Sequence, residues 1–203
     1  PQVAFYQMFD TERVEILNYA PEIENICILD DLGKISKDAS ETMIKIQMDL
    51  CLYETMMSRR VNFRYKDLSS VLHSVKFFEY IKRLFSKGDE SIPQKIKNEK
   101  PILNYAVHNL LSYSRPLFKV LSDKILIIEV VRHPLYMIIQ QTLNQINVHG
   151  TARQFHLYIK YKMNQLPYYN YGQEKLFIES KPVERAIYEM QNISRLTKTA
   201  KID

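Results

Sequence analysis

The sequence predicts an α/β fold, a helix-rich layered domain built around a small parallel sheet. Several segments have helical periodicity, and one continuous β-branched run, Lys124–Val131, is typical of a buried strand. The chain has only 4 glycines among 203 residues, about 2% against a usual ~7%. Left-handed turns depend on glycine, so this count argues against an all-β sandwich. We expect residues 1–203 to form a single domain.

Helices are predicted where apolar residues recur at steps of three and four. The predicted helices are Asp38–Arg59, Leu68–Phe85, a helix after His133-Pro134, a helix near Ala152–Met163 and a last helix that starts at Ser180 and Pro182. Asp67 is the expected N-cap of the second helix, and proline suits the first turn of the third. The third helix is expected to bury Leu135, Ile138, Ile139, Leu143 and Ile146.

Strands are predicted from short apolar runs. Lys124–Val131 is continuous rather than alternating and is bounded by charge, as expected for a parallel strand covered on both faces. Shorter candidates are Pro101–Val107, Ile23–Leu29 and Lys175–Ile178. The polar segment Lys87–Lys100 contains Pro93 and is predicted to be a connection.

Composition excludes several classes of protein. Hydrophobic residues make up 46% of the chain and charged residues 25%, which excludes a disordered chain. Two cysteines cannot form a disulfide framework or a cysteine-rich zinc site, and no clustered ligands indicate a metal. No apolar run approaches the ~18 residues of a membrane span, and no signal peptide is visible. We therefore expect a cytoplasmic protein without a membrane span.

The chain carries 28 basic and 23 acidic residues, a net charge of +5. This excess is compatible with anionic partners, although codon bias in an A/T-rich genome explains the abundant lysine equally well. The chain begins at Pro1 rather than at methionine, so we expect it to be a piece of a longer protein.

Arg132 is the first candidate for binding a ligand. It follows the predicted strand and precedes a predicted helix, and ligands of parallel sheets bind at the carboxyl ends of strands. A helix start favours an anion, and an arginine can hold a phosphate through two parallel hydrogen bonds. The alternative is a solvated arginine, or one paired with an acid such as Glu129.

His108 is the candidate general base. It follows the predicted strand Pro101–Val107, and a parallel arrangement of the two strands would bring it to the same sheet edge as Arg132. An imidazole can accept a proton near neutral pH. The alternative is a histidine with a purely structural role.

The stretch from Lys100 to Gln145 resembles the sulfotransferase family, which uses 3′-phosphoadenosine 5′-phosphosulfate as co-substrate. The matching motif is a strand, an arginine, a proline and a helix, here IIEVVRHPLY at residues 127–136. The resemblance implies that Arg132 contacts the 3′-phosphate of the nucleotide. It implies that His108, 24 residues upstream, is the general base. Gln140 stands where family members usually have a serine on the same phosphate.

The resemblance also implies a fold and a reaction. The fold would be an incomplete nucleoside-triphosphate-hydrolase-like domain. The reaction would move a sulfuryl group to an acceptor hydroxyl, possibly on a carbohydrate, without a metal. The family's first motif, a glycine-containing loop that holds the 5′-phosphosulfate, is absent from these residues. We therefore expect the full-length protein to be the enzyme and this chain alone to transfer no sulfuryl group.

Two other functions remain open. One is a non-enzymatic basic helical module that binds nucleic acid or a protein, for which the basic segment Arg59–Lys66 is the best feature. The acidic residues of the helix Asp38–Arg59 argue against a nucleic-acid partner. The other is a different nucleotide-dependent transferase or kinase on the same fold. The tyrosines of the segment Pro167–Gly172 could stack on a sugar or pack as a loop. The oligomeric state is not predicted.

Overall fold

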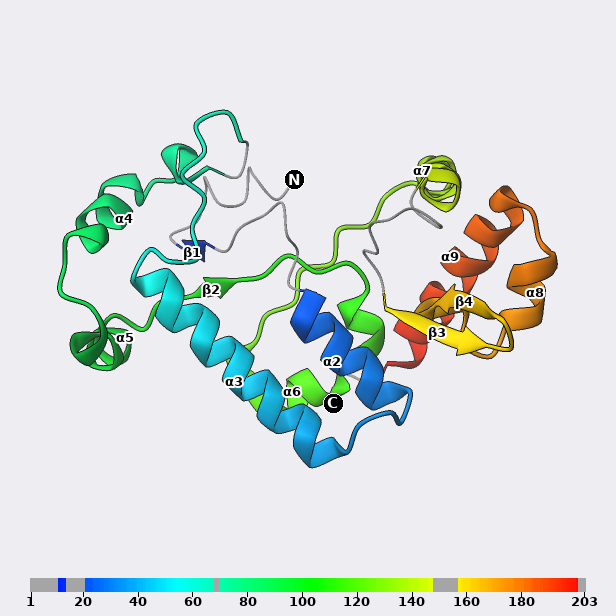
Figure 1. The fold of residues 1–203 in the computed structure, drawn as a ribbon, viewed down its shortest axis with the longest axis horizontal. Helices are drawn as coiled ribbons and strands as arrows, with labels where there is room; N and C mark the ends of the chain where they lie inside the picture. Colours follow the sequence, from blue (N-terminus) through cyan, green and yellow to red (C-terminus); the bar gives the residue numbers. More distant parts are fainter. Residues whose placement is uncertain (1–10, 14–20, 68–69, 148–156, 201–203) are drawn as a thin grey trace. The chain divides into compact units, whose positions relative to one another are not determined.

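The computed structural model describes residues 11–13, 21–67, 70–147 and 157–200. Contacts divide the chain into two compact units, which are described separately. The first unit comprises Pro1–Ile26 and Ile35–His108, and the second comprises Cys27–Lys34 and Asn109–Asp203. Helices are the main elements of both units (Figure 1).

The first unit is built mainly from helices. Its elements are β1 (Glu12–Arg13), the start of α2 (Pro21–Asp31), α3 (Lys37–Met56), α4 (Phe77–Leu84), α5 (Ile92–Glu99) and β2 (Leu103–Asn104). β1 and β2 pair in parallel, with Glu12 opposite Leu103. The predicted strand Pro101–Val107 is therefore present as two residues only.

Helix α3 confirms the prediction for Asp38–Arg59. Its buried residues, among them Ile44 and Cys51, follow the helical spacing. Near its end, Met56 and Met57 form an apolar cluster with Ile92 of α5, against which partly buried residues of both helices pack. This cluster joins the two helices of the first unit.

Three predictions for the first unit are wrong in detail. Ile23–Leu29 lies in helix α2, because Pro21 and the acidic residues of the first turn favour a helix start over a strand. Lys87–Lys100 contains helix α5, in which Pro93 occupies the first turn and does not prevent helix formation. In the described part of Leu68–Phe85, only Phe77–Leu84 is α-helical, after a short turn of 3-10 helix.

The second unit combines helices with one hairpin. Besides the end of α2, its elements are η3 (Leu110–Tyr113), α6 (Arg115–Leu121), η4 (Ser122–Lys124), α7 (Pro134–Asn147), β3 (Tyr158–Tyr161), β4 (Asn164–Pro167), η5 (Tyr168–Asn170), α8 (Glu174–Glu179) and α9 (Pro182–Thr199). β3 and β4 are antiparallel, with Tyr158 opposite Pro167. Helices α7 and α9 pack against each other and form the main helix pair of this unit.

The structure of the last helix and of the tyrosine-rich segment can be compared with the sequence predictions. Helix α9 starts at Pro182, as predicted, and it buries Ala186. Tyr168 and Tyr169 are buried, and their rings meet edge to face, so this segment is a packed loop rather than an exposed stacking platform. Tyr171 alone of the three tyrosines is exposed.

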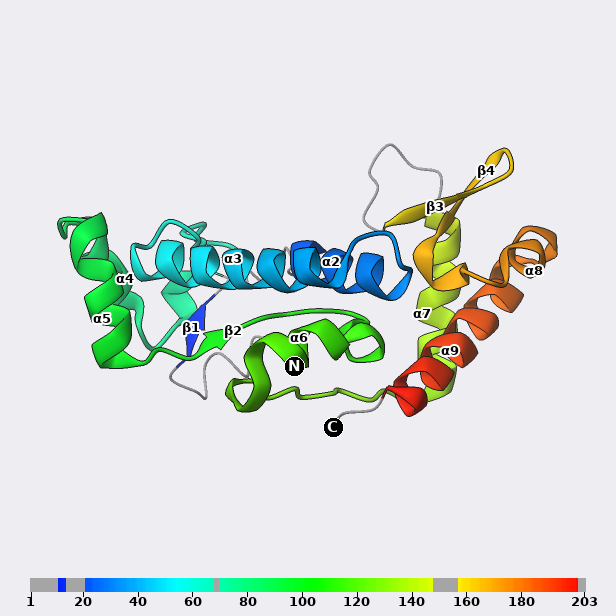
Figure 2. The same cartoon turned by 90° about the horizontal axis from the view of Figure 1, so that it is seen from below.

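The predicted buried strand Lys124–Val131 is wrong. Residues 125–133 are extended without regular structure (Figure 2), and no strand among the described residues pairs with them. Leu126 is 84% exposed and Val131 80% exposed. The apolar sequence favours burial on two faces, but the described residues provide no neighbouring strand or covering helix layer. The helix-rich class therefore holds, while the parallel sheet expected around this segment does not form.

Other predictions for the second unit are also corrected. Lys175–Ile178 is helical within α8, since a short apolar run does not distinguish a strand from a helix. In the region Ala152–Met163, residues 152–156 lie outside the described residues and Tyr158–Tyr161 is strand β3. Helix α7 is confirmed, but four of its five expected core residues are exposed: Leu135, Ile139, Leu143 and Ile146.

Candidate functional site

Arg132 lies in the exposed segment that leads into α7. It directly precedes His133 and the first helical residue, Pro134, as the sequence predicts. It does not stand at the rim of a parallel sheet, because residues 125–131 form no strand. Its guanidinium is therefore presented to solvent by an extended segment and a helix start.

The start of α7 does not offer free backbone donors. The N–H of Leu135 donates to Nδ1 of His133 at 3.3 Å. The N–H groups of Tyr136 and Met137 donate to the carbonyl oxygen of His133 at 3.1 and 3.2 Å, and Pro134 has no N–H. His133 thus caps the helix that was expected to bind an anion, so an anion at this place would be held by the Arg132 side chain.

His108 ends the first unit, four residues after β2. Its backbone N–H donates to Oε2 of the buried Glu24 at 2.9 Å, which fixes the main chain, and the residue is exposed. This exposed histidine on a fixed backbone retains the accessibility that a general base requires. His108 belongs to the first unit, whereas Arg132 and Gln140 belong to the second.

Gln140 lies on the exposed side of α7, within its second turn. Its Nε2 is 3.4 Å from Oδ1 of Asn144, one turn further along the helix. This long contact leaves the amide accessible, but nothing in the structure aims it at Arg132.

The sequence did not reveal a buried ionic cluster in the first unit. Glu12 on β1 is 1% exposed and accepts hydrogen bonds at 2.8 Å from Nη1 and Nη2 of Arg83. The hydroxyl of Tyr80 and Nζ of Lys76 complete the cluster at 2.8 and 3.1 Å. Burial raises the pKa of Glu12, but Arg83 and its other partners outweigh burial and lower the pKa to about 2. Every acceptor position is used internally, so the cluster is structural.

The second unit contains a different buried acid. Glu189 on α9 is 4% exposed and accepts a hydrogen bond from Nε2 of Gln145 on α7 at 3.0 Å. Burial raises its pKa to about 7, although the Gln145 hydrogen bond opposes the shift. Burial also raises the pKa of the neighbouring Tyr169. The negative charge of Glu189 raises this pKa further. One sequence signal could have indicated this burial. Glu189 follows Ala186 by three positions and therefore lies on the same, apolar side of α9.

A groove of about 400 Å³ opens on the second unit. Apolar side chains including Leu29, Leu32 and Ile159 line it, together with Lys34 and Lys160. None of the predicted site residues lines this groove.

Searches for related proteins and for common site types gave no assignment. The chain matches no protein-family model, no curated protein and no solved structure. Over the described ranges, we find no group of three or more His, Cys, Asp or Glu side chains that could hold a metal ion. Over the same residues, no helix is both long and apolar enough to cross a membrane.

Proposed function

We propose that this chain contributes the nucleotide 3′-phosphate site of a sulfotransferase. The observation that carries the proposal is the sequence from Ile127 to Tyr136, in which an exposed arginine joins an apolar β-branched segment to a helix that starts at proline. The proposal is supported by the motif and by the accessibility of Arg132. The sheet that presents this arginine in the family is not formed by the described residues.

Each of the proposed residues has one role. Arg132 holds the 3′-phosphate of 3′-phosphoadenosine 5′-phosphosulfate through its planar guanidinium. Gln140 offers an amide donor from helix α7, which begins just after Arg132. His108 takes the proton of an acceptor hydroxyl while the acceptor oxygen bonds to sulfur. The bond between sulfur and the phosphate oxygen breaks, and adenosine 3′,5′-bisphosphate leaves.

Nucleotide binding tests the proposal directly. Calorimetry should show that adenosine 3′,5′-bisphosphate binds more tightly than adenosine 5′-monophosphate, which lacks the 3′-phosphate. Arg132→Ala should weaken binding of the bisphosphate at least about tenfold, since hydrogen bonds to charged groups contribute about 1.5–3 kcal/mol. It should leave binding of the monophosphate unchanged.

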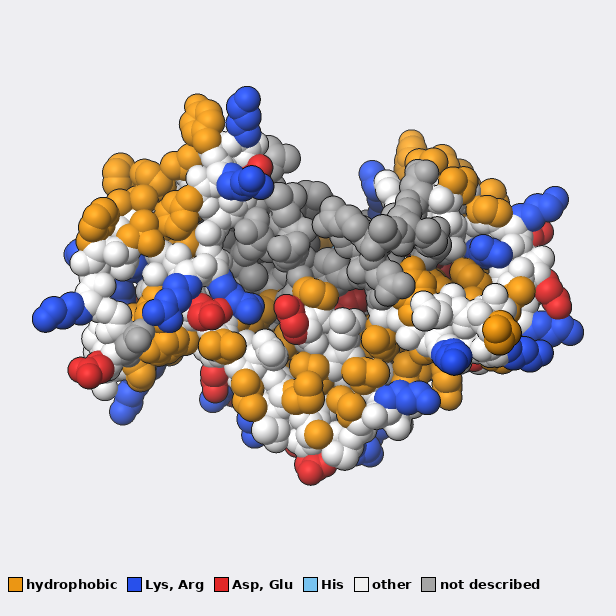
Figure 3. Space-filling model, in the orientation of Figure 1, with side chains coloured by type: hydrophobic (Ala, Val, Ile, Leu, Met, Phe, Trp, Pro, Cys, Tyr) orange, Lys and Arg blue, Asp and Glu red, His pale blue; other side chains and the backbone are white. Residues whose placement is uncertain are grey.

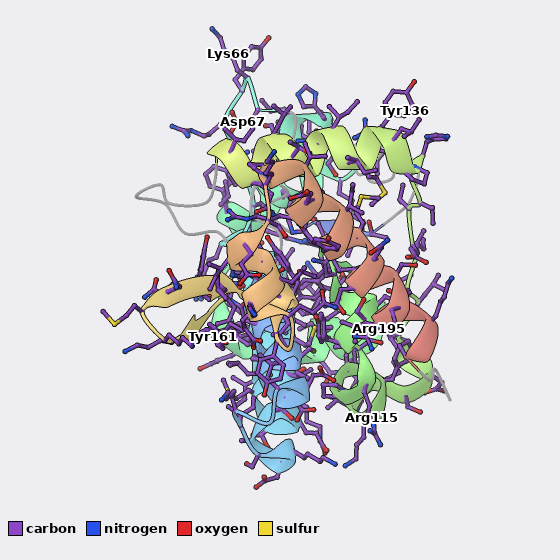
Figure 4. All side chains as sticks on the ribbon, turned by 90° about the vertical axis from the view of Figure 1, so that its right-hand side faces the viewer. Lys66, Asp67, Arg115, Tyr136, Tyr161 and Arg195 are labelled. Atoms are coloured by element: carbon purple, nitrogen blue, oxygen red, sulfur yellow. The ribbon has the colours of Figure 1, made fainter. Side chains whose placement is uncertain are left out.

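Arg115 provides a matched control. Like Arg132, it is an exposed arginine beside the proline that starts a helix, here α6, but no β-branched segment precedes it (Figure 4). Arg115→Ala should bind both nucleotides like the unmodified chain. Equal affinity for the two nucleotides, or equal losses in the two variants, would remove the basis for the assignment and favour a nonspecific basic surface.

A further inference from the structure

Helix α4 of the first unit buries its polar side and exposes an aromatic side. Tyr80 and Arg83 are buried, and both hydrogen-bond to the carboxylate of Glu12 at 2.8 Å. Phe78 and Phe85 are seven positions apart and share the opposite face of the helix. They are 81% and 86% exposed. The contacts to Glu12 therefore hold α4 with these two rings in solvent.

The two phenylalanines belong to a larger exposed apolar surface of the first unit. Its members are Tyr65, Leu72, Val75, Phe78, Leu84 and Phe85, which are between 37% and 86% exposed. Figure 3 shows hydrophobic side chains gathered over α4, with Lys and Arg side chains beside them. An apolar surface rimmed by polar residues marks an interaction site.

The exposed charges of the same segment are mostly positive. Residues 64–87 contain six basic and two acidic side chains. Two of the basic residues, Lys76 and Arg83, bind Glu12 inside the unit. The other four basic residues are exposed, and they are Arg64, Lys66, Lys82 and Lys87. In Figure 4, Lys66 extends away from the ribbon.

The two acidic residues do little to offset this charge. Asp67 accepts a hydrogen bond from Nδ2 of Asn62 at 3.1 Å, and Glu79 lies 3.7 Å from Nη2 of Arg83. Lys82 is four positions after Phe78 and three before Phe85, so a positive charge lies between the two exposed rings. The surface thus combines exposed aromatic and aliphatic groups with positive charge.

We propose that this surface of the first unit binds to an anionic lipid bilayer. Aromatic and aliphatic side chains on one helix face insert at the boundary between headgroups and acyl chains. Exposed lysine and arginine side chains attract the acidic headgroups around them. Phe78 and Phe85 enter the bilayer surface, and Lys82 contacts a lipid phosphate or carboxylate. The four exposed basic residues are complementary in charge to such a surface.

The aliphatic members favour a bilayer over a single-stranded nucleic acid. Nucleic-acid bases bind to proteins by stacking on rings. Leu72, Val75 and Leu84 have no ring, yet they make up half of the exposed apolar surface. An acyl-chain boundary accommodates aliphatic and aromatic side chains alike.

Vesicle binding tests the proposal. The full chain should sediment with vesicles of phosphatidylcholine and phosphatidylserine, and much less with vesicles of phosphatidylcholine alone. Salt should weaken the binding, because it screens the basic side chains. The double variant Phe78→Ser/Phe85→Ser should raise the dissociation constant for the mixed vesicles at least about tenfold. Lys82→Gln should raise it about fivefold.

Matched controls come from the second unit. Leu126→Ser/Met163→Ser removes two apolar side chains that are 84% and 96% exposed. Lys175→Gln removes an exposed lysine of α8. Both control variants should bind the mixed vesicles like the unmodified chain. Circular dichroism should show equal helix content in all variants.

Three results would overturn the proposal: no binding to either kind of vesicle, equal binding to both kinds, or equal losses in the control variants. Binding of a single-stranded oligonucleotide that requires Phe78 and Phe85, without vesicle binding, would overturn it in favour of a nucleic-acid partner. Arg132 belongs to the second unit, so the variants of α4 should leave nucleotide affinity unchanged. Vesicle binding and nucleotide binding can therefore fail separately.

Discussion

At the scale of single residues, Glu12 is the charge on which the first unit depends most. Three side chains from α4 and the residue before it, Lys76, Tyr80 and Arg83, hydrogen-bond to one carboxylate. Because these groups come from a segment more than sixty residues away in sequence, the carboxylate anchors β1 to α4. Removing one partner of a buried ion pair leaves the other charge without compensation.

We therefore predict that Glu12→Gln lowers the free energy of unfolding by about 3 kcal/mol at pH 7. Urea unfolding measures this change. The folded pKa of Glu12, about 2, lies below its ordinary value of 4.5, so the charged carboxylate stabilises the fold above pH 4.5. This stabilisation is lost as the pH falls from 4.5 to about 2, and the difference between the two proteins should shrink over that range. Glu79→Gln, at an exposed and weaker partner of Arg83, should have little effect.

At the scale of elements, Glu189 makes the packing of α7 and α9 dependent on pH. Its carboxyl group is buried between the helices with the amide of Gln145 and near the phenol of Tyr169. The folded pKa, about 7, lies above the ordinary value of 4.5, so the folded state binds the proton more tightly than the unfolded state. Stability from this group is complete below pH 4.5 and is lost as the pH rises to about 7.

Glu189→Gln should remove this pH dependence, because the amide is similar in shape and carries no charge. At pH 8 the variant should be more stable than the unmodified chain, by no more than about 3 kcal/mol. At pH 4.5 the two should differ little. Chemical unfolding at both pH values measures the difference, and a variant that is less stable at pH 8 would show that Glu189 is charged and well solvated.

At the scale of the whole molecule, the two compact units should unfold in two steps. The Glu12 cluster lies within the first unit and the Glu189 pair within the second. Calorimetry should resolve two transitions, since units with their own cores can unfold independently. Glu12→Gln should lower only one transition temperature, and Glu189→Gln at pH 8 should raise only the other. A single transition that both substitutions move would show one cooperative unit.

Helical periodicity predicted α3, α7 and α9, because a long amphipathic pattern specifies a helix without help from the rest of the chain. Pro134 and Pro182 also marked the starts of their helices, since proline is preorganised for the first turn. The exposure of Arg132 before α7 agrees with the role that the sequence assigned to it, although that role itself stays a prediction.

Short apolar runs were a different case. Ile23–Leu29 and Lys175–Ile178 are helical, and residues 125–131 form no strand, because short apolar runs suit a helix, a strand or an open segment equally well. The elements that pack against such a segment decide which of these structures it adopts. The same holds for the buried acids Glu12 and Glu189, whose partners come from distant segments that no local pattern connects.

Local spacing in the sequence was enough to predict the long helices α3, α7 and α9 and to place an arginine just before α7. Which apolar residues are buried and which carboxylates are enclosed became clear from the three-dimensional packing alone. Burial requires two surfaces that pack against each other, and the sequence of a segment describes only one of them.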